Sequence, residues 1–239
     1  MRMRKKKNSA SRLDACRGFL YKHEGEPMAA PGSVMNMTDA PVYLEIGAGK
    51  GRFAAMMAAR HSDCAYFAME RVTDCVVIGA ERAVSGEFGE LKNLRFVIDT
   101  ADNLMHIFKT GTVSKIFLNF SDPWSKKGYA KRRLTHARYL AMYMNLLCDG
   151  GEIQFKTDNV ALFDFSLEQI AQMGLECDVV ERDLHASEWN GDNIMTEYEE
   201  NFSSQGMKIN MLRLKKPSGY NPEIDTAFIE KRIFRGNDG

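Results

Sequence analysis

The chain has 239 residues, of which 44% are apolar and 27% charged, and its 32 Lys and Arg residues balance its 32 Asp and Glu residues. A chain of this size buries about 70% or more of its unfolded surface without cross-links, and its five cysteines, an odd number without a C-x-x-C pair, argue against a disulfide framework and a zinc ribbon. No apolar run approaches the roughly 18 residues of a membrane span and no secretory signal is evident, so we expect a cytoplasmic protein without membrane contact.

Short apolar runs rich in β-forming residues alternate along the chain with longer segments of helical period. This alternation predicts an α/β fold with a mostly parallel, doubly wound sheet and right-handed crossovers. In such sheets a ligand binds beyond the carboxyl ends of the strands, so the residues that follow each strand are the candidate site residues. The expected strands are 42–46, 64–69, 94–98, 113–119, 151–156, 175–181 and 207–214. The expected helices are 51–60, 71–84, 134–148, 160–173 and 196–204.

The two ends of the chain differ from this pattern. We expect a basic, partly flexible N-terminal segment at 1–40, the main domain at 41–214 and a C-terminal extension of unassigned role at 215–239. Breaker residues predict loose order from 8 to 41 and a mobile tail from Pro217. Five positive charges lie in residues 1–7 (MRMRKKK) and five more in residues 126–133 (KKGYAKRR). Such clusters can bind phosphate even on a neutral protein, because at moderate salt only charges within about 10 Å of a phosphate attract it appreciably.

The segment after the first expected strand is rich in glycine. Residues 44–51 read LEIGAGKG, so Gly47, Gly49 and Gly51 stand between a strand and a helix. Glycines at such a turn let the backbone bend sharply and let a ligand lie against the main chain, where a Cβ would intrude. A dinucleotide-binding G-x-G-x-x-G needs a glycine where this chain has Arg52, so the dinucleotide fingerprint fails.

Two glutamates accompany these glycines. Glu45, at the end of the first strand, is poorly placed beside a phosphate but well placed near a cation. Glu70, after the second strand, is placed to accept the two hydroxyls of a ribose. Together these residues favour a positively charged nucleoside without phosphate, which describes S-adenosylmethionine. The alternative is that residues 47–51 form only a tight turn and that both glutamates are solvated.

An unusual polar segment follows the fourth expected strand. Residues 119–133 read NFSDPWSKKGYAKRR, which places Asp122, Pro123 and Trp124 at the ligand edge with five cations directly after them. Each feature taken singly has a structural interpretation. Asp122-Pro123 fits the start of a turn, Trp124 fits a partly buried anchor, and the basic run fits a solvated loop. Their adjacency favours a phosphate-binding surface beside a carboxylate and a ring that can stack on a base.

Four motifs, LEIGAGKG, NFSDPWSKKGYAKRRL, FKTDN and NIMTEYE, together resemble the bacterial tRNA (guanine-N7-)-methyltransferases, the TrmB family. The resemblance covers residues 40–214, and MRMRKKK is also typical of it. It implies a class I S-adenosylmethionine-dependent methyltransferase fold, which is a Rossmann-like, mostly parallel seven-stranded sheet with helices on both faces. It further implies S-adenosylmethionine as donor, S-adenosylhomocysteine as product, no metal, and the variable-loop guanosine of tRNA (position 46) as acceptor. The protein is then a monomer or a homodimer with tRNA as its partner.

The resemblance also implies roles for individual residues. Asp122 matches the catalytic position and a cofactor-contacting acid. The other cofactor positions are Glu45, Gly47, Gly49, Gly51, Glu70, Asp99 and Thr100. The substrate positions are Lys126, Asp158, Thr196 and Glu199, and the RNA-binding stretch is Gly128, Tyr129, Ala130, Lys131, Arg132 and Arg133. The family usually has an aspartate directly before an alanine after the third strand. Here that place holds Thr100, preceded by Asp99, so both stay candidates for the adenine contact.

Guanine N7 carries a lone pair and no proton, so methylation at this atom needs no general base, and orientation is the main demand. As the methyl group moves, positive charge leaves sulfur and develops on the purine. We expect Asp122 to orient the base and to support this charge, with Asp158 as a second acceptor. We expect Lys126 and the cations of 131–133 to contact phosphates.

Helix capping is the alternative role for several of these polar residues. In KTDNVALF, Asp158 or Asn159 fits the N-cap of the helix that starts near Val160. Thr196 and Glu199 fit a capping box, T-x-x-E. A capped helix end still offers backbone donors, so capping and binding are compatible.

Two other functions compete with this one. An exocyclic-amine nucleobase methyltransferase carries Asp/Asn/Ser-Pro-Pro-aromatic after the same strand, and residues 121–124 (SDPW) lack the first proline. A non-catalytic RNA-binding module is opposed by the intact set of glycines and glutamates. The five histidines are scattered, so we expect no metal site, and the 15 methionines are expected to fill gaps in the core.

Overall fold

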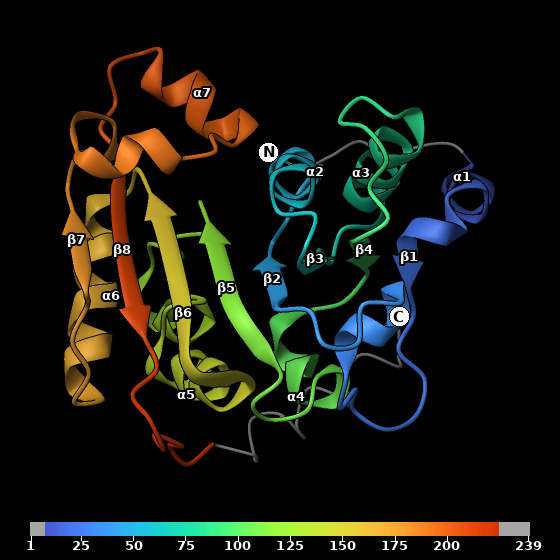
Figure 1. The fold of residues 1–239 in the computed structure, drawn as a ribbon. Coiled ribbons are helices and arrows are strands. Elements are labelled where there is room, and N and C mark those ends of the chain that lie inside the picture. The colour runs from blue at the N-terminus through green and yellow to red at the C-terminus, as the bar shows by residue number, and fades with distance from the viewer. Residues whose placement is uncertain (1–7, 225–239) are drawn as a thin grey trace.

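One sheet contains all the strands of residues 8–224, the part of the chain that the computed structural model describes. The strands are β1 (Leu20–Tyr21), β2 (Val42–Ile46), β3 (Ala65–Met69), β4 (Leu94–Val97), β5 (Val113–Asn119), β6 (Leu147–Thr157), β7 (Val179–Glu181) and β8 (Asn210–Lys215). Their order across the sheet is β1-β4-β3-β2-β5-β6-β8-β7 (Figure 1). β8 is antiparallel to both of its neighbours, and every other neighbouring pair is parallel. The basic cluster at 1–7 and the tail residues 225–239 lie outside the described residues.

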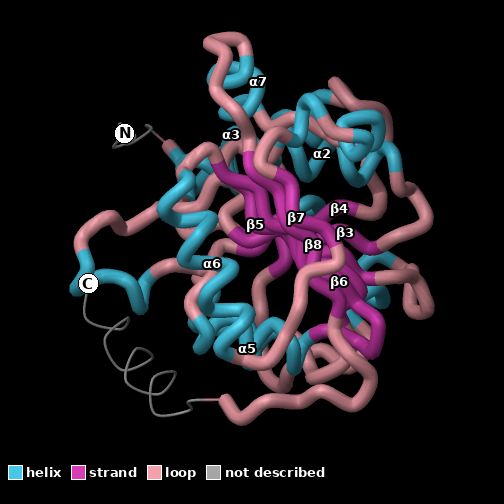
Figure 2. Tube along the Cα trace, turned by 90° about the vertical axis from the view of Figure 1, so that its left-hand side faces the viewer, coloured by secondary structure: helices cyan, strands magenta, loops and turns pink. Residues whose placement is uncertain are grey.

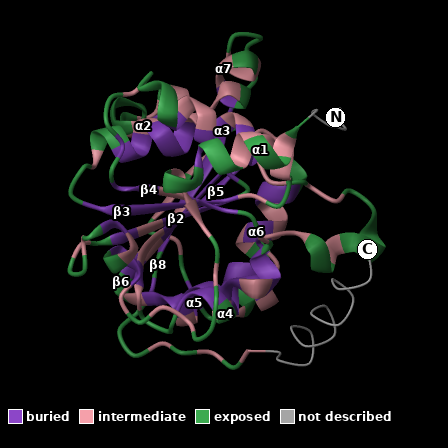
Figure 3. Ribbon diagram, turned by 90° about the vertical axis from the view of Figure 1, so that its right-hand side faces the viewer, coloured by how far each residue is buried: buried purple, intermediate pink, exposed green. Residues whose placement is uncertain are grey.

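Helices cover both faces of this sheet. They are α1 (Ser9–Ala15), α2 (Arg52–Arg60), α3 (Thr73–Ser85), α4 (Leu104–Ile107), α5 (Ala137–Leu146), α6 (Val160–Gln172) and α7 (Glu197–Ser203). In Figure 3, α1, α2 and α3 lie on one side of the sheet and α4, α5 and α6 on the other. Figure 2 shows the same layering, with the strands between α2 and the pair α5 and α6. No helix within residues 8–224 is long and apolar enough to cross a membrane.

The two larger hydrophobic cores follow from the alternation of side chains along the strands. In β3, for example, Ala65, Phe67 and Met69 pack with the layer of α4, α5 and α6. Tyr66 and Ala68 point the other way and pack with α2 and α3. All five residues are buried, as expected for a parallel strand that is covered on both faces.

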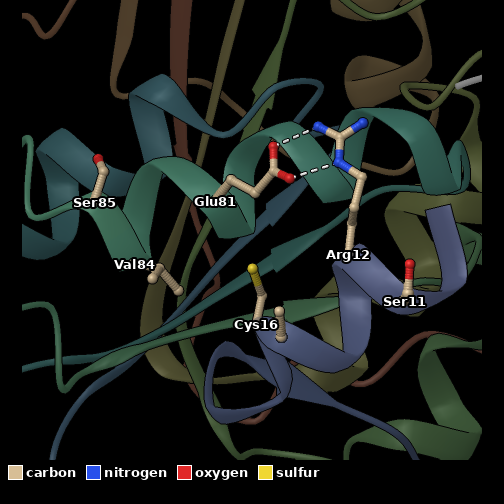
Figure 4. Close-up of a pocket in the computed structure, with 7 residues that line it drawn as sticks. Ser11, Arg12, Cys16, Glu81, Val84 and Ser85 are labelled. Atoms are coloured by element: carbon tan, nitrogen blue, oxygen red, sulfur yellow. Dashed lines mark hydrogen bonds and ion pairs between the residues drawn. The ribbon is translucent and has the colours of Figure 1, made fainter. Parts of the chain in front are cut away.

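α1 docks on the outer side of α3. The Arg12 guanidinium donates two hydrogen bonds of 2.6 Å to the Glu81 carboxylate, and the Ser9 hydroxyl donates to Asp74 at 2.6 Å. Figure 4 shows the small pocket beside this ion pair, which Cys16 and Val84 also line. These contacts fix the N-terminal segment to the helix layer, although the sequence predicts only loose order from 8 to 41.

The seven strands and five helices expected from the sequence are all present; the strands 42–46 and 113–119 have the predicted bounds, and the other elements have shifted ends. The sheet has eight strands rather than the predicted seven, because Leu20 and Tyr21 form β1 and pair with Phe96 and Val97 of β4. A strand of two residues is too short to leave a periodic signal in the sequence. α1 and α4 are the helices that the sequence does not predict.

The tail beyond Pro217 is packed as far as the structure describes it. The Tyr220 hydroxyl donates to the carbonyl of Met173 at the end of α6 at 2.9 Å, and Asn145 of α5 donates to the carbonyl of Pro222 at 2.9 Å. This part of the predicted mobile extension therefore lies against the layer of α5 and α6.

Close packing of α2 and α3 over the buried ring of Phe96 gives a stability prediction. A Cβ on Gly79 of α3 would lie 2.8 Å from Phe96 Cε1. We expect Gly79→Ala to lower the free energy of unfolding by about 1–3 kcal/mol, because the added Cβ would force the fully buried ring of Phe96 to shift. Urea denaturation measures this change. Gly191→Ala is the control, since a Cβ at Gly191 meets nothing within 4 Å, and equal stability of the two variants would contradict the prediction.

Candidate active site

The predicted polar residues converge at the carboxyl ends of the parallel strands β2 to β6. In Figure 1 the arrowheads of β2, β5 and β6 point toward the side of the molecule where α7 lies. Glu45 of β2 pairs in register with Ala68 of β3 and Phe117 of β5, and Asn119 of β5 pairs with Lys156 of β6. Side chains from these strand ends therefore meet at one edge of the sheet.

Glu45 is the buried acid of this edge, with only 2% of the residue exposed. Asn119 Nδ2 donates to Glu45 Oε1 at 2.9 Å. Burial raises the pKa of Glu45 to about 7, although the bond from Asn119 and the positive charge of Lys156 partly offset this effect. The other oxygens of the pair, Glu45 Oε2 and Asn119 Oδ1, are buried and have no hydrogen-bond partner among residues 8–224. Because buried polar atoms are nearly always paired, these two oxygens are suited to a ligand that donates hydrogen bonds.

The glycine loop leaves open space against the main chain. Gly47 and Gly49 have φ angles of 84° and 55°, and a Cβ at either position would meet nothing within 4 Å. Gly51 differs, because a Cβ there would lie 2.6 Å from Phe96 Cε1, so this glycine allows helix packing. Glu70 supports the loop by accepting hydrogen bonds from the backbone N–H of Gly49 at 3.0 Å and of Val72 at 2.8 Å. The alternative of two solvated glutamates therefore does not fit, since Glu45 is buried and Glu70 holds the glycine loop.

Asp99 and Thr100 lie in the loop that follows β4. Asp99 Oδ1 accepts hydrogen bonds from the Thr100 N–H and from Asn103 Nδ2, both at 2.7 Å. Thr100 is exposed and precedes a short 3-10 turn at Ala101–Asn103. Asp99 thus stabilises the turn in which Thr100 is exposed to solvent.

The loop after β5 carries Asp122 between two residues with left-handed backbone. Phe120 has a φ of 50° and Trp124 a φ of 41°. Such a conformation costs a non-glycine residue about 1–3 kcal/mol and persists only where the surroundings hold it, commonly at functional sites. Asp122 is 68% exposed, and its Oδ2 lies 3.7 Å from the guanidinium of Arg71, the residue after Glu70. The catalytic candidate and the ribose candidate therefore lie on adjacent loops.

Three lysines of the basic segment, Lys126, Lys127 and Lys131, are exposed. They lie in or beside a 3-10 helix at Lys127–Arg132, to which Gly128 and Ala130 also belong. Within residues 8–224, no carboxylate lies at ion-pair distance from their ammonium groups. Their charges are available to an external anion.

The two arginines of the segment are engaged within the chain. The Arg132 guanidinium lies over the rings of Trp124 and Tyr129, 5.0 and 4.7 Å from their centroids. Arg133 donates from Nε to the Pro123 carbonyl at 2.9 Å and from a terminal nitrogen to the Trp124 carbonyl at 3.3 Å. The cations of 131–133 are therefore not equivalent.

A buried ion pair lies between β6 and the start of α7. Lys156 Nζ and Glu199 Oε2 are 2.6 Å apart, and both side chains are 0% exposed. Glu199 also accepts hydrogen bonds from His185 at 2.9 Å and Asn193 at 2.7 Å. Burial raises the pKa of Glu199, but Lys156 and the hydrogen bonds outweigh this effect and hold the pKa below its usual value. Burial lowers the pKa of Lys156.

The capping interpretations of the polar residues are confirmed. Thr196 Oγ1 accepts from the Glu199 N–H and the Glu199 carboxylate accepts from the Thr196 N–H, which completes a capping box at α7. Asn159 caps α6 by accepting from the Leu162 N–H at 2.8 Å. Asp158 is not the cap, and its Oδ2 accepts from the Tyr198 hydroxyl at 3.4 Å. Among the substrate candidates, Asp158, Thr196 and Lys126 are at least partly exposed, whereas Glu199 is not.

α7 is also tied to the cofactor side of the edge. Glu200 forms an ion pair with Arg52 at the start of α2. Glu197 pairs with Arg82 of α3 at 2.8 Å and lies 3.9 Å from Lys50 in the glycine loop. These pairs hold the segment with Thr196 next to the loop with Gly47 and Gly49.

The motifs do not predict Asn119, Lys156 or His185 as site residues. Lys156 had a usable signal, because a charged residue in the expected strand 151–156 stands where an apolar residue belongs. Asn119 ends its expected strand, which is the position from which parallel strands present ligands. His185 carries no signal in the sequence, because only the fold brings its side chain to Glu199.

The strand order, with a single antiparallel strand between its neighbours, is that of the class I S-adenosylmethionine-dependent methyltransferase fold, and the open glycine loop and the buried acid lie at its ligand edge. Solved structures agree with this fold. The 16S rRNA methyltransferase KamB aligns with a TM-score of 0.60 at 14% identity, covering 83% of this chain and 98% of that chain. An antibiotic-related methyltransferase aligns with a TM-score of 0.59 at 15% identity, covering 83% and 96%.

Sequence comparison identifies the family. Residues 39–212 match the model of a family described as putative methyltransferase. The tRNA (guanine-N(7)-)-methyltransferase of Bacillus cytotoxicus is 39% identical over 217 residues, which is 90% of this chain and 97% of the relative. The enzyme of that name from Geobacillus sp. is 42% identical over 179 residues, or 75% and 80% of the two chains. The chain belongs to the tRNA (guanine-N7-)-methyltransferase family, so the resemblance seen in its motifs is confirmed.

Proposed function

We propose that this protein transfers the methyl group of S-adenosylmethionine to N7 of a guanosine in tRNA, and that this guanosine is the one in the variable loop. The observation that carries the proposal is the meeting of Glu45, the open glycine loop and Asp122 at one edge of the sheet. The names of the relatives support this reaction over amine methylation and over RNA binding without catalysis. We place the protein in the cytoplasm with tRNA as its partner, as a monomer or a homodimer.

The residues at the strand ends fit S-adenosylmethionine, which supplies a methyl group on a positively charged sulfur. The buried free oxygens of Glu45 and Asn119 would accept hydrogen bonds from its ammonium group. Gly47 and Gly49 would leave room for contact with the main chain. Glu70 would accept the ribose hydroxyls, and Asp99 or Thr100 would contact the adenine. Two exposed apolar side chains that follow β3 and β4, Val72 and Ile98, would offer apolar contacts to the adenine.

The raised pKa of Glu45 predicts pH-dependent cofactor binding. Only the ionised carboxylate attracts a cationic ligand, so affinity for S-adenosylmethionine should rise as the pH rises through about 7. Isothermal titration calorimetry between about pH 6 and about pH 8 measures this change. Glu45→Gln should bind more weakly and lose the pH dependence. An equal pH dependence in the variant would contradict the role of Glu45.

The same pKa predicts the effect of Glu45 on stability. The pKa of the folded state, about 7, lies above the ordinary value of 4.5. The contribution of Glu45 to stability is therefore complete below the unfolded pKa and is lost as the pH rises through about 7.

Asp122 and Asp158 are the acids that we assign to the guanine. Asp122 lies on the strained loop after β5, and Asp158 follows β6 and is held by Tyr198. Neither needs to take a proton from N7. Both are placed to accept hydrogen bonds from the edge of the base and to support the positive charge that develops on it.

The exposed lysines of the basic segment are assigned to tRNA phosphates. We expect Lys126→Ala/Lys131→Ala to weaken tRNA binding and to reduce the slope of log affinity against log salt by about 0.7–0.9 per lost contact. Filter binding over a series of KCl concentrations measures the slope. Lys92→Ala/Lys215→Ala is the control, because these exposed lysines lie at the opposite edge of the sheet, before β4 and at the end of the antiparallel β8. An unchanged slope in the first variant would refute the assignment.

Nucleoside analysis tests the proposed reaction directly. tRNA from a strain that lacks the protein should lack 7-methylguanosine, and incubation of that tRNA with the protein and S-adenosylmethionine should restore it. Mass spectrometry of nuclease fragments identifies the modified position. Persistence of 7-methylguanosine in the strain, with no transfer in vitro, would overturn the proposal, and transfer outside the variable loop would overturn its assignment of position.

A further inference from the structure

Arg133 contacts the Asp122 loop rather than projecting freely from the basic segment. Its Nε and one terminal nitrogen donate to two successive carbonyls, those of Pro123 and Trp124, at 2.9 and 3.3 Å. The guanidinium carbon lies 4.3 Å from the centroid of the Phe165 ring in α6. Arg133 therefore joins the loop after β5 to the helix that follows β6.

The loop that receives these bonds needs an external support. Phe120 and Trp124, which enclose Ser121-Asp122-Pro123, are two of the four non-glycine residues with positive φ within residues 8–224. At the first of them the Phe120 N–H donates to the Lys156 carbonyl at 2.9 Å. At the second, the Trp124 carbonyl accepts a hydrogen bond from the Arg133 guanidinium. A left-handed residue persists only where such contacts fix it.

The geometry of a guanidinium suits this task. Its planar fork can donate to two neighbouring carbonyls at once while one face lies on an aromatic ring. A lysine ammonium carries the same charge but acts as a point and cannot reproduce the fork. Charge alone would serve a phosphate contact, whereas the observed contacts use the shape of the side chain.

We infer that Arg133 is a positioning residue that holds the Pro123–Trp124 backbone, and with it Asp122, in the geometry for methyl transfer, and that it is not one of the phosphate contacts. This inference rests on the proposed function for its catalytic consequence. The lysines of the segment bind the polynucleotide, and Arg133 orients the loop that they flank.

The substitution Arg133→Lys separates the two roles, because it keeps the charge and removes the fork. At saturating tRNA and S-adenosylmethionine we expect Arg133→Lys and Arg133→Met to lower the single-turnover rate by about 10–100-fold, since a small misplacement of a reacting group can cost this much. The salt slope of tRNA binding should stay that of the unmodified protein in both variants. Lys131→Met is the matched control, and it should reduce the slope by about 0.7–0.9. A normal rate in Arg133→Lys, or a slope that falls in Arg133→Met as in Lys131→Met, would overturn the inference.

A fluorescence measurement tests the support of the loop without any substrate. The chain has two tryptophans, so Trp189→Phe leaves Trp124 as the only one. In that background, Arg133→Lys and Arg133→Met should increase the quenching of Trp124 by acrylamide, because the carbonyl of this residue loses its partner. Unchanged quenching in both variants would overturn the inference. Failure of the unmodified protein to methylate tRNA would instead contradict the proposed function, and the quenching comparison would still decide whether Arg133 supports the loop.

Discussion

Replacing Asp122 with asparagine is expected to lower the single-turnover rate of guanine N7 methylation by about 10²–10³-fold at saturating tRNA and cofactor. A loss of this size follows the removal of one fixed group that supports charge developing in the transition state. Asparagine keeps the shape and can accept a hydrogen bond, but it lacks the negative charge. Asp122→Ala removes the hydrogen bond as well and should be slower still. Rapid-quench assays with labelled methyl donor measure both rates.

Asp164→Asn is a matched control for this experiment. Asp164 of α6 is 49% exposed and forms an ion pair with Arg182, much as Asp122 lies beside Arg71. We therefore expect Asp164→Asn to leave the rate unchanged. Rates close to that of the unmodified protein in both Asp122 variants would end the assignment of Asp122 to the reaction.

The fold was predictable because local patterns decide most of it. Four apolar residues around Glu45, between Pro41 and Gly47, predict the strand β2, and the apolar stripe of 134–148 predicts a helix that lies on a sheet, which is α5. β1 could not be predicted in this way, because two residues are too few to show a periodic pattern. Their pairing with β4 also depends on residues more than 70 positions further along the chain. The packing of α1 on α3 escaped it as well, since the Arg12–Glu81 ion pair spans 69 residues.

Part of the site was equally predictable. Glycines and acids at strand ends are visible in the sequence, and parallel topology places Glu45, Glu70 and Asp122 at one edge. The sequence does not distinguish the cations of 126–133, because a run of basic residues does not show that Lys131 is exposed whereas Arg133 is hydrogen-bonded to the Asp122 loop. It also leaves open whether Glu199 binds or caps, and only the burial of Lys156 beside it shows that this carboxylate already has its partners.

Lys156 connects the two halves of the site electrostatically. Its ammonium group pairs with Glu199 at the start of α7, and its positive charge lowers the pKa of Glu45 on the cofactor side. α7 in turn carries Glu200, which pairs with Arg52 beside the glycine loop. The cofactor acid and the segment with Thr196 therefore depend on one buried cation.

Lys156→Met is consequently expected to reduce the free energy of unfolding by about 3–5 kcal/mol, the usual cost of leaving one member of a buried ion pair without its partner. Glu199 would keep His185 and Asn193 but would lose the ammonium group that lowers its pKa. Urea denaturation measures the change. Adding Glu199→Gln should recover part of the loss, because it removes the isolated charge, so the double variant should be more stable than the sum of single effects predicts.

Lys215→Met on the neighbouring strand β8 is the control, since that residue is exposed and a surface substitution changes stability by about 0.5 kcal/mol or less. A loss below about 1 kcal/mol in Lys156→Met would contradict the importance of the pair.

The Lys156→Met variant should also change cofactor binding. Without the positive charge of Lys156, the pKa of Glu45 should rise further above about 7, and the pH at which S-adenosylmethionine binding reaches its midpoint should move upward with it. Calorimetric titrations of folded Lys156→Met across the pH range measure this midpoint, and an unshifted value would show that Lys156 acts on α7 alone.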